Sequence, residues 1–213
     1  MMTDLYFIRH GQSEANVSQS FAGSTDSPLT PLGQKQAEAT SAFFEDIKPD
    51  KVYASPLKRA YNTGLAVAKR YNLEIETDKR LQEIYGGKWE SVPFAELINL
   101  YHDDFNVWLT DLGKAVCTEG ESTVELQNRV NEAVNEIVKN NPGKKIVIAT
   151  HATPIRVMEC IWNKVSLTEM KDIPWVSNAS VTHVRYENGE GKIILRSYDK
   201  HLGDMTTELP KGI

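Results

Sequence analysis

Short apolar runs alternate with amphipathic stretches along this chain. Residues 5–8 are apolar throughout and residues 146–149 form the strongest apolar run, so both predict buried strands. The predicted strands cover residues 5–8, 51–55, 74–77, 145–150, 180–186 and 192–198. Apolar residues at helical spacing predict helices between them, with Thr30 as a cap before Pro31 and Ser122 as a cap of the helix that runs to about residue 140. These helices cover residues 31–47, 57–71, 93–112, 122–140 and 154–162.

The order of these elements predicts an α/β fold with a mainly parallel sheet flanked by helices on both faces. Asn188-Gly189 is a typical hairpin turn, so we expect the last two strands to pair at an edge of the sheet. No repeat or low-complexity segment divides the chain, which predicts a single domain over residues 1–213. Residues 91–119 predict a helical lid insertion over the carboxyl ends of the strands. Its apolar stripe is more typical of core packing than of a substrate-binding wall.

Composition and charge narrow the classes of partner. The 213-residue chain has a formal net charge of −5 and a pI of about 5.6, so we expect no broad basic surface for nucleic acid. No apolar run reaches membrane length and the N-terminus does not resemble a signal peptide, so we expect no membrane partner. Cys117 and Cys160 lie far apart and outside any metal-ligand spacing, which is typical of reduced cysteines in a cytoplasmic protein.

Basic and titratable residues follow three of the predicted strands. Arg9 and His10 end the first strand, and Arg59 lies at the start of the helix after the second. His151 ends the strongest strand. Because parallel strands place their carboxyl ends at one edge of a sheet, we expect these residues to meet. Together they predict an anion site, in which planar guanidinium groups bind oxygens and the His10 ring offers a nucleophilic nitrogen.

The same residues lie in longer sequence motifs. Residues 9–16 read R-H-G-Q-S-E-A-N, which is similar to the signature R-H-G-[EQ]-[ST]-x-x-N of the histidine phosphatase (phosphoglycerate mutase-like) superfamily, phosphatase branch. Other family-like segments are L-T-P-L-G-Q-K-Q-A at 29–37, S-P-L-K-R-A-Y-N-T at 55–63, L-Q-E-I-Y-G-G-K-W-E at 81–90, G-E-S at 120–122, N-A-S-V at 178–181 and D-K-H-L at 199–202. The matches occur in order over nearly the whole chain, so the resemblance implies a phosphoglycerate mutase-like fold.

The resemblance implies a role for each matching residue. His10 would attack phosphorus and become a phosphohistidine, while Glu83 would protonate the leaving oxygen and later deprotonate water. The groups that would bind the phosphate are the side chains of Arg9, Asn16, Arg59 and His151 and the backbone N–H of Ala152. Arginines and a cationic histidine around the phosphoryl oxygens would take the place of a metal, so neither a metal nor a cofactor is expected.

Two points stay open at the level of sequence. The first step needs a protonated Glu83, so we expect burial to raise its pKa, helped by Tyr85 or Trp89 and opposed by the two arginines. The second histidine is followed by Ala152, where the family usually has glycine, and the extra Cβ takes space near the far end of a substrate.

Three functions compete. The first is a metal-independent hydrolase of a small phosphomonoester, the second a cofactor-dependent phosphoglycerate mutase, and the third a catalytically silent phosphate-binding regulatory module. Residues 91–112 contain neither Lys nor Arg, and a bisphosphate needs additional cationic partners, which favours the hydrolase. The candidate nucleophile, acid and arginines are all present, which disfavours the silent module. A metal site at His10 and His151 is disfavoured because neither has acidic neighbours at ligand spacing. A homodimer stays open.

Overall fold

A six-stranded sheet forms the centre of the molecule, in the order β3-β2-β4-β1-β5-β6. The computed structural model describes residues 1–208, so residues 209–213 of the predicted domain lie outside the described part. The strands are β1 (Thr3–Arg9), β2 (Lys51–Ala54), β3 (Ile75–Thr77), β4 (Lys145–Thr150), β5 (Val181–Glu187) and β6 (Glu190–Tyr198). β1 to β4 pair in parallel, whereas β5 and β6 join as an antiparallel hairpin at one edge. The predicted mainly parallel sheet is therefore confirmed.

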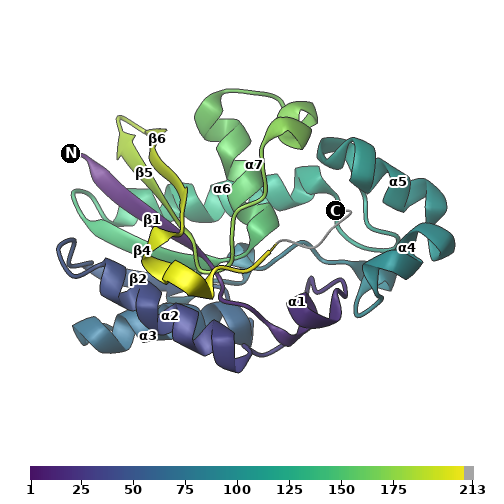
Figure 1. Ribbon diagram of the computed structural model, residues 1–213. Coiled ribbons are helices and arrows are strands. Elements are labelled where there is room, and N and C mark those ends of the chain that lie inside the picture. Colours follow the sequence, from purple (N-terminus) through teal and green to yellow (C-terminus); the bar gives the residue numbers. More distant parts are fainter. Residues whose placement is uncertain (209–213) are drawn as a thin grey trace.

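Helices cover both faces of the sheet, as predicted (Figure 1). The α-helices are α1 (Glu14–Ser18), α2 (Pro31–Phe43), α3 (Lys58–Tyr71), α4 (Phe94–Leu100), α5 (His102–Thr110), α6 (Thr123–Asn140) and α7 (Ala152–Asn163). Short 3₁₀ helices cover Lys79–Leu81, Gly87–Trp89, Leu112–Lys114, Leu167–Asp172 and Lys200–Met205. Tyr6 and Ile8 of β1 pack in the core beneath α2 and α3, whereas Leu5 and Phe7 pack on the side of α6 and α7.

Two glycines bring the first two sequence motifs into backbone contact. A Cβ on Gly11 would stand 2.5 Å from the carbonyl oxygen of Gly33, and one on Gly33 would stand 2.0 Å from that of Gln12. Only glycine permits this approach. The start of α2, which Thr30 caps by accepting the N–H of Gly33 at 3.0 Å, is thereby fixed beside the loop that follows β1.

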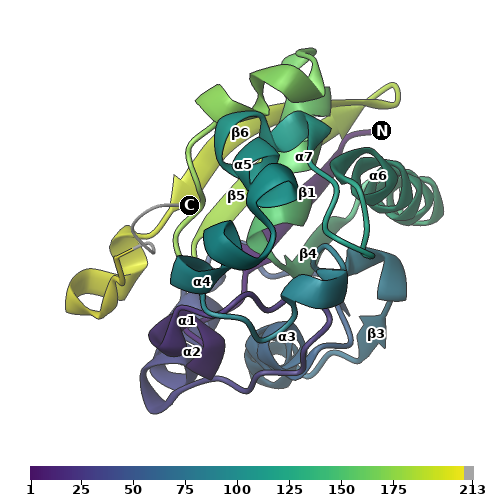
Figure 2. The ribbon, with the colours of Figure 1, turned by 90° about the vertical axis from the view of Figure 1, so that its right-hand side faces the viewer.

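The predicted lid, residues 91–119, contains α4, α5 and the 3₁₀ helix Leu112–Lys114. Helices α4 and α5 lie beyond the carboxyl ends of the strands (Figure 2), and a role as a lid stays a prediction. Leu97, Phe105 and Trp108 are buried in the main core, so the apolar stripe serves mostly in packing, as its spacing indicates. Phe94 and Trp108 also line a cavity at the strand ends. Within residues 1–208, no helix is long and apolar enough to cross a bilayer. Both cysteines are buried free thiols.

Candidate active site

Residues at or after the carboxyl ends of β2, β4 and β1, three neighbouring strands, meet at one cavity. Arg9 ends β1, and His10 follows with its backbone N–H donating to the carbonyl of Thr150 at 3.0 Å. Arg59 reaches the cavity from the first turn of α3. His151 lies beneath the cavity wall, fully buried, with its ring centroid 5.2 Å from that of His10. The structure thus brings the four residues together, with His151 behind His10.

The ring of His10 is held in one tautomer. Its Nδ1 lies 2.7 Å from the carbonyl oxygen of Gly11, and because a carbonyl only accepts, Nδ1 carries the hydrogen. The Nε2 lone pair is then free in the neutral ring. Burial, and next the positive charges of Arg59 and Arg9, hold the pKa of His10 well below its ordinary value. The free site therefore presents an uncharged, oriented imidazole to the cavity.

His151 differs from the expected cationic residue. Burial, followed by the positive charge of Arg59, lowers its pKa well below the ordinary value, so the free site holds it neutral. Its Nε2 lies 2.8 Å from Oγ of Ser55, whereas its buried Nδ1 has no hydrogen-bond partner among the described residues. The sequence could not show this, because depth of burial depends on how β4 and α7 pack.

The two arginines have different surroundings. Arg9 donates from Nη1 to the carbonyl of Val176 at 2.6 Å, and its buried Nε has no partner within the described part of the chain. Arg59 donates from Nη1 to the carbonyl of Thr25 and from Nη2 to those of Ala22 and Gly23, at 2.7–2.9 Å. Arg59 therefore also holds the loop that forms one rim of the cavity, a role the sequence did not reveal.

Glu83 lines the same cavity with its carboxylate held by two backbone N–H groups. Oε1 accepts the N–H of Ile84 at 2.8 Å and Oε2 that of Thr153 at 3.2 Å. Burial raises the pKa of Glu83, and these hydrogen bonds and the charge of Arg59 offset only part of that rise. The sequence does not show whether burial or the two arginines have the larger effect on this pKa. In the structure the effect of burial is the larger. The expected help from Tyr85 or Trp89 stays a prediction; the side chain of Tyr85 is half exposed and that of Trp89 is buried.

Two asparagines, Asn16 and Asn178, are hydrogen-bonded to each other, and Asn178 also contacts the backbone of the candidate nucleophile His10. The Oδ1 atom of Asn16 accepts the backbone N–H of Ser13 at 3.0 Å and the amide of Asn178 at 3.1 Å, which leaves the amide nitrogen of Asn16 for a ligand. Asn178 also donates to the carbonyl of His10 at 3.1 Å. Asn178 lies in the family-like segment 178–181, but its role is not visible in the sequence, because its contacts with His10 and Asn16 span more than 160 positions.

One wall of the cavity is apolar and aromatic. It consists of Phe21, Ile84, Phe94, Trp108 and Trp175. The lid residues among these lie in the predicted insertion, but Phe21 and Trp175 carry no sequence signal for a ligand wall. Ala152 and Thr153, at the start of α7, complete the floor, so the alanine that replaces the usual glycine does face the cavity.

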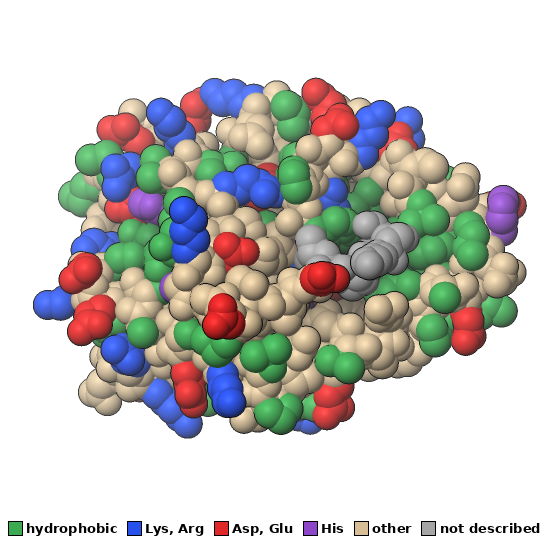
Figure 3. Space-filling view, viewed as in Figure 1, with side chains coloured by type: hydrophobic (Ala, Val, Ile, Leu, Met, Phe, Trp, Pro, Cys, Tyr) green, Lys and Arg blue, Asp and Glu red, His purple; other side chains and the backbone are tan. Residues whose placement is uncertain are grey.

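Charge elsewhere on the molecule is mixed. On the face drawn in Figure 3, Lys and Arg side chains are interspersed with Asp and Glu. Within residues 1–208, no three His, Cys, Asp or Glu side chains are grouped as metal ligands. The expected absence of nucleic-acid partners, metal and cofactor stays a prediction.

Comparison with known proteins gives consistent matches. Phosphoserine phosphatase 1 of Hydrogenobacter thermophilus is 31% identical over 212 residues that span both chains completely. Glucosyl-3-phosphoglycerate phosphatase of Mycobacterium tuberculosis is 27% identical over 84% of each chain. The solved structure of YhfR from Bacillus stearothermophilus matches with a TM-score of 0.90 at 27% identity, covering 94% of this chain and 99% of that one. The family model of the histidine phosphatase superfamily (branch 1) matches residues 5–199, so this chain belongs to that superfamily.

Proposed function

We propose that the chain is a metal-independent phosphomonoester hydrolase that acts on a small phosphorylated metabolite through a phosphohistidine on His10. The observation that carries the proposal is the buried, neutral His10 ring, fixed by Gly11, in a cavity that also holds Arg9 and Glu83. A neutral nitrogen nucleophile, a cationic clamp and a carboxyl with a raised pKa are the groups that phosphoryl transfer to histidine requires.

In the first step, the Nε2 lone pair of His10 forms a bond to phosphorus while the bond from phosphorus to the ester oxygen breaks. Glu83 gives its proton to that oxygen, so the product leaves as a neutral alcohol and Glu83 becomes a carboxylate. The ring gains positive charge as it is phosphorylated, which strengthens the hydrogen bond from Nδ1 to Gly11. Donors of Arg9 and Arg59 hold the non-bridging oxygens.

In the second step, the Glu83 carboxylate takes a proton from water, whose oxygen attacks phosphorus. The bond from phosphorus to Nε2 breaks and its electron pair returns to His10, which releases phosphate and restores the protonated carboxyl. The buried Nδ1 of His151 has no partner among the described residues, and the negative charge of a phosphate bound in the adjoining cavity would favour protonation of that ring.

Hydrolysis is favoured over mutase activity by the charges around the cavity. Among the described residues that line it, the cationic ones are Arg9 and Arg59. A bisphosphate would need a second set of cationic partners. The relatives from Hydrogenobacter thermophilus and Mycobacterium tuberculosis named above are phosphatases, which also supports a hydrolase. A cytoplasmic location and a homodimer remain predictions from the sequence.

A metabolite screen tests the proposal. The purified protein is assayed for phosphate release from p-nitrophenyl phosphate, phosphoserine and a panel of other phosphomonoesters, with mutase activity on 3-phosphoglycerate measured alongside. The proposal expects phosphate release that is lost in His10→Ala. Interconversion of phosphoglycerates faster than hydrolysis would establish the mutase, and no turnover of any ester would establish the silent module.

A further inference from the structure

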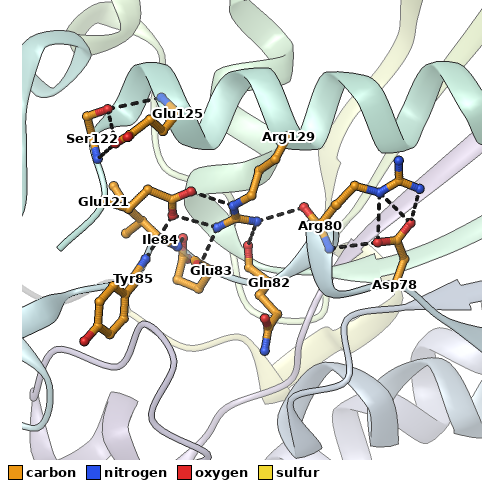
Figure 4. Close-up of polar contacts among 10 residues, drawn as sticks. All are labelled: Asp78, Arg80, Gln82, Glu83, Ile84, Tyr85, Glu121, Ser122, Glu125 and Arg129. Carbon is orange, nitrogen blue, oxygen red and sulfur yellow. Dashed lines mark hydrogen bonds and ion pairs between the residues drawn. The ribbon is translucent and has the colours of Figure 1, made fainter.

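Arg129, on helix α6, holds the backbone of the segment that carries Glu83 (Figure 4). Its Nη1 donates to the carbonyl oxygens of Arg80 and Gln82, both at 2.8 Å. Its Nη2 donates to the carbonyl of Glu83 at 2.9 Å. One side chain thus holds three carbonyl groups immediately before and at the candidate general acid.

Glu121 completes this arrangement. Its Oε1 accepts Nε of Arg129 at 2.6 Å, and its Oε2 accepts Nη2 of the same residue at 2.8 Å. With the three carbonyl contacts, all five N–H groups of Arg129 are used. Oε2 of Glu121 also accepts the backbone N–H of Tyr85 at 3.0 Å, so the pair holds the segment on both sides of Glu83.

The family-like G-E-S segment at 120–122 explains how this pair is built. Ser122 caps α6 by accepting the N–H of Glu125 at 3.2 Å, and Glu125 accepts the N–H of Ser122 at 2.9 Å. This reciprocal cap fixes the first turn of α6 directly after Glu121. Arg129 follows on the same helix, where its fork meets the Glu121 carboxylate with little freedom.

We infer that Arg129 is a positioning residue for Glu83, with Glu121 as the group that orients it. The inference rests on the proposed function. The carboxyl of Glu83 can protonate a leaving oxygen only if the backbone beneath it stays in place, and a displacement of about 1 Å costs about 10²-fold in rate. Because Glu121 carries the opposite charge, Arg129 holds that backbone without adding net positive charge beside the carboxyl.

Arg80 provides a matched control. It also joins this segment to α6, through Glu132 at 3.2 Å and Glu136 at 2.8 Å. The carboxylates of Glu132 and Glu136 are well exposed, and such pairs contribute little to stability. The remaining side-chain partner of Arg80 is Asp78 of the same segment, at 2.7 Å. Among the described contacts, the side chain of Arg80 donates to none of the carbonyls of residues 82–85. Its removal frees the outer end of the segment but leaves Glu83 held.

The test compares kcat/KM for an alkyl phosphate and for p-nitrophenyl phosphate in four variants. An alkoxide needs a proton as it leaves, whereas p-nitrophenolate does not. Arg129→Ala should lower kcat/KM for the alkyl ester about 10²-fold and that for the aryl ester less than about threefold. Glu83→Gln should show the same selectivity. For the alkyl ester, kcat/KM of Arg129→Lys should lie between the values of Arg129→Ala and the wild type. Arg80→Gln should leave kcat/KM for both esters within about twofold of the wild type.

A rescue experiment separates positioning from folding. A solvent-open cavity lined in part by Gln82, Tyr85, Glu121 and Arg129 gives small solutes access to this place. Millimolar guanidinium chloride should restore alkyl-ester turnover in Arg129→Ala, whereas sodium chloride at the same concentration should not. If thermal unfolding shows that the Arg129→Ala variant is not folded, the same comparison between the two esters is made with Arg129→Lys.

The outcomes distinguish the two claims. If the Arg129 variants lose kcat/KM equally for both esters while Glu83→Gln still loses more with the alkyl ester, the positioning role is overturned and the proposed function still holds. If Glu83→Gln itself affects both esters equally, Glu83 is not the acid and both claims fail.

Discussion

The backbone N–H of Thr153 lies 3.2 Å from Oε2 of Glu83, although the two residues are 70 positions apart. Thr153 belongs to the first turn of α7, directly after His151. The start of this helix therefore carries the second histidine and also holds the candidate acid. Helix α6 holds the backbone of Glu83 through Arg129, so the acid is fixed from two helices at once.

The raised pKa of Glu83 predicts the pH dependence of the first step. The protonated carboxyl is the active form, so kcat/KM should fall as the pH rises through that raised value. His10 stays neutral well below pH 6.5, so no loss of activity from its protonation is expected near that pH. A pH profile with an alkyl phosphate measures this. Glu83→Gln should lack the descending limb, and a limb that survives the substitution would assign it to another group.

The buried neutral histidines predict acid sensitivity of the fold. The pKa values of His10 and His151 are lowered on folding, so below pH about 6.5 the unfolded state binds more protons than the folded state. The free energy of unfolding therefore decreases as the pH is lowered. Each histidine contributes at most about 1.4 kcal/mol per pH unit. The free energy of unfolding, measured by urea titration between pH 5 and 7, should fall less steeply in His10→Gln. His102→Gln, at an exposed site, is the control, and an equal slope in both variants would contradict the prediction.

Most of the sheet could be predicted from the sequence because its signals are local. The apolar run in β4 and the Asn188-Gly189 turn each specify their element without distant contacts. The end of α2 could not be placed. The helix stops at Phe43 rather than at residue 47, because residues 44–47 form turns that lead to Lys48 at φ 54°. Helical spacing continues through such turns, so the pattern alone does not show the end.

Arg59→Met should weaken both classes of ester by the same factor. Arg59 faces phosphoryl oxygens common to every substrate, and loss of one such donor costs about 10²–10³-fold. The variant should also unfold at a lower temperature, because three loop carbonyls lose their donor. Lys58→Met is the matched control, because the side chain of Lys58, the residue before Arg59, is exposed and pairs with Asp26. Unequal loss for alkyl and aryl esters would assign Arg59 a role at the leaving group.

Vanadate should inhibit competitively, and chelators should not inhibit. The five-coordinate vanadate adduct resembles the in-line transition state, which the site binds more tightly than the substrate. Initial rates with excess EDTA, measured in separate assays from vanadate, should equal those of the untreated enzyme. Loss of activity on chelation that added Mg²⁺ or Zn²⁺ restores would refute the metal-independent mechanism.

The candidate site could be predicted in part. The residues at the strand ends carry a signal because parallel strands converge, and the structure brings Arg9, His10 and Arg59 to one cavity. Arg129 and Asn178 gave no such signal, because each acts through backbone carbonyls of residues far along the chain. The neutral state of His151 also depends on burial that only the packed fold defines.

A rapid-quench measurement tests the central claim, that His10 is the nucleophile. The enzyme is mixed with substrate labelled in its phosphoryl group and stopped within milliseconds under alkaline conditions. We expect up to one phosphoryl group per chain, stable to base and labile to acid, on the peptide that contains His10, and none in His10→Ala. A phosphoserine, or label that persists in His10→Ala, would contradict the mechanism.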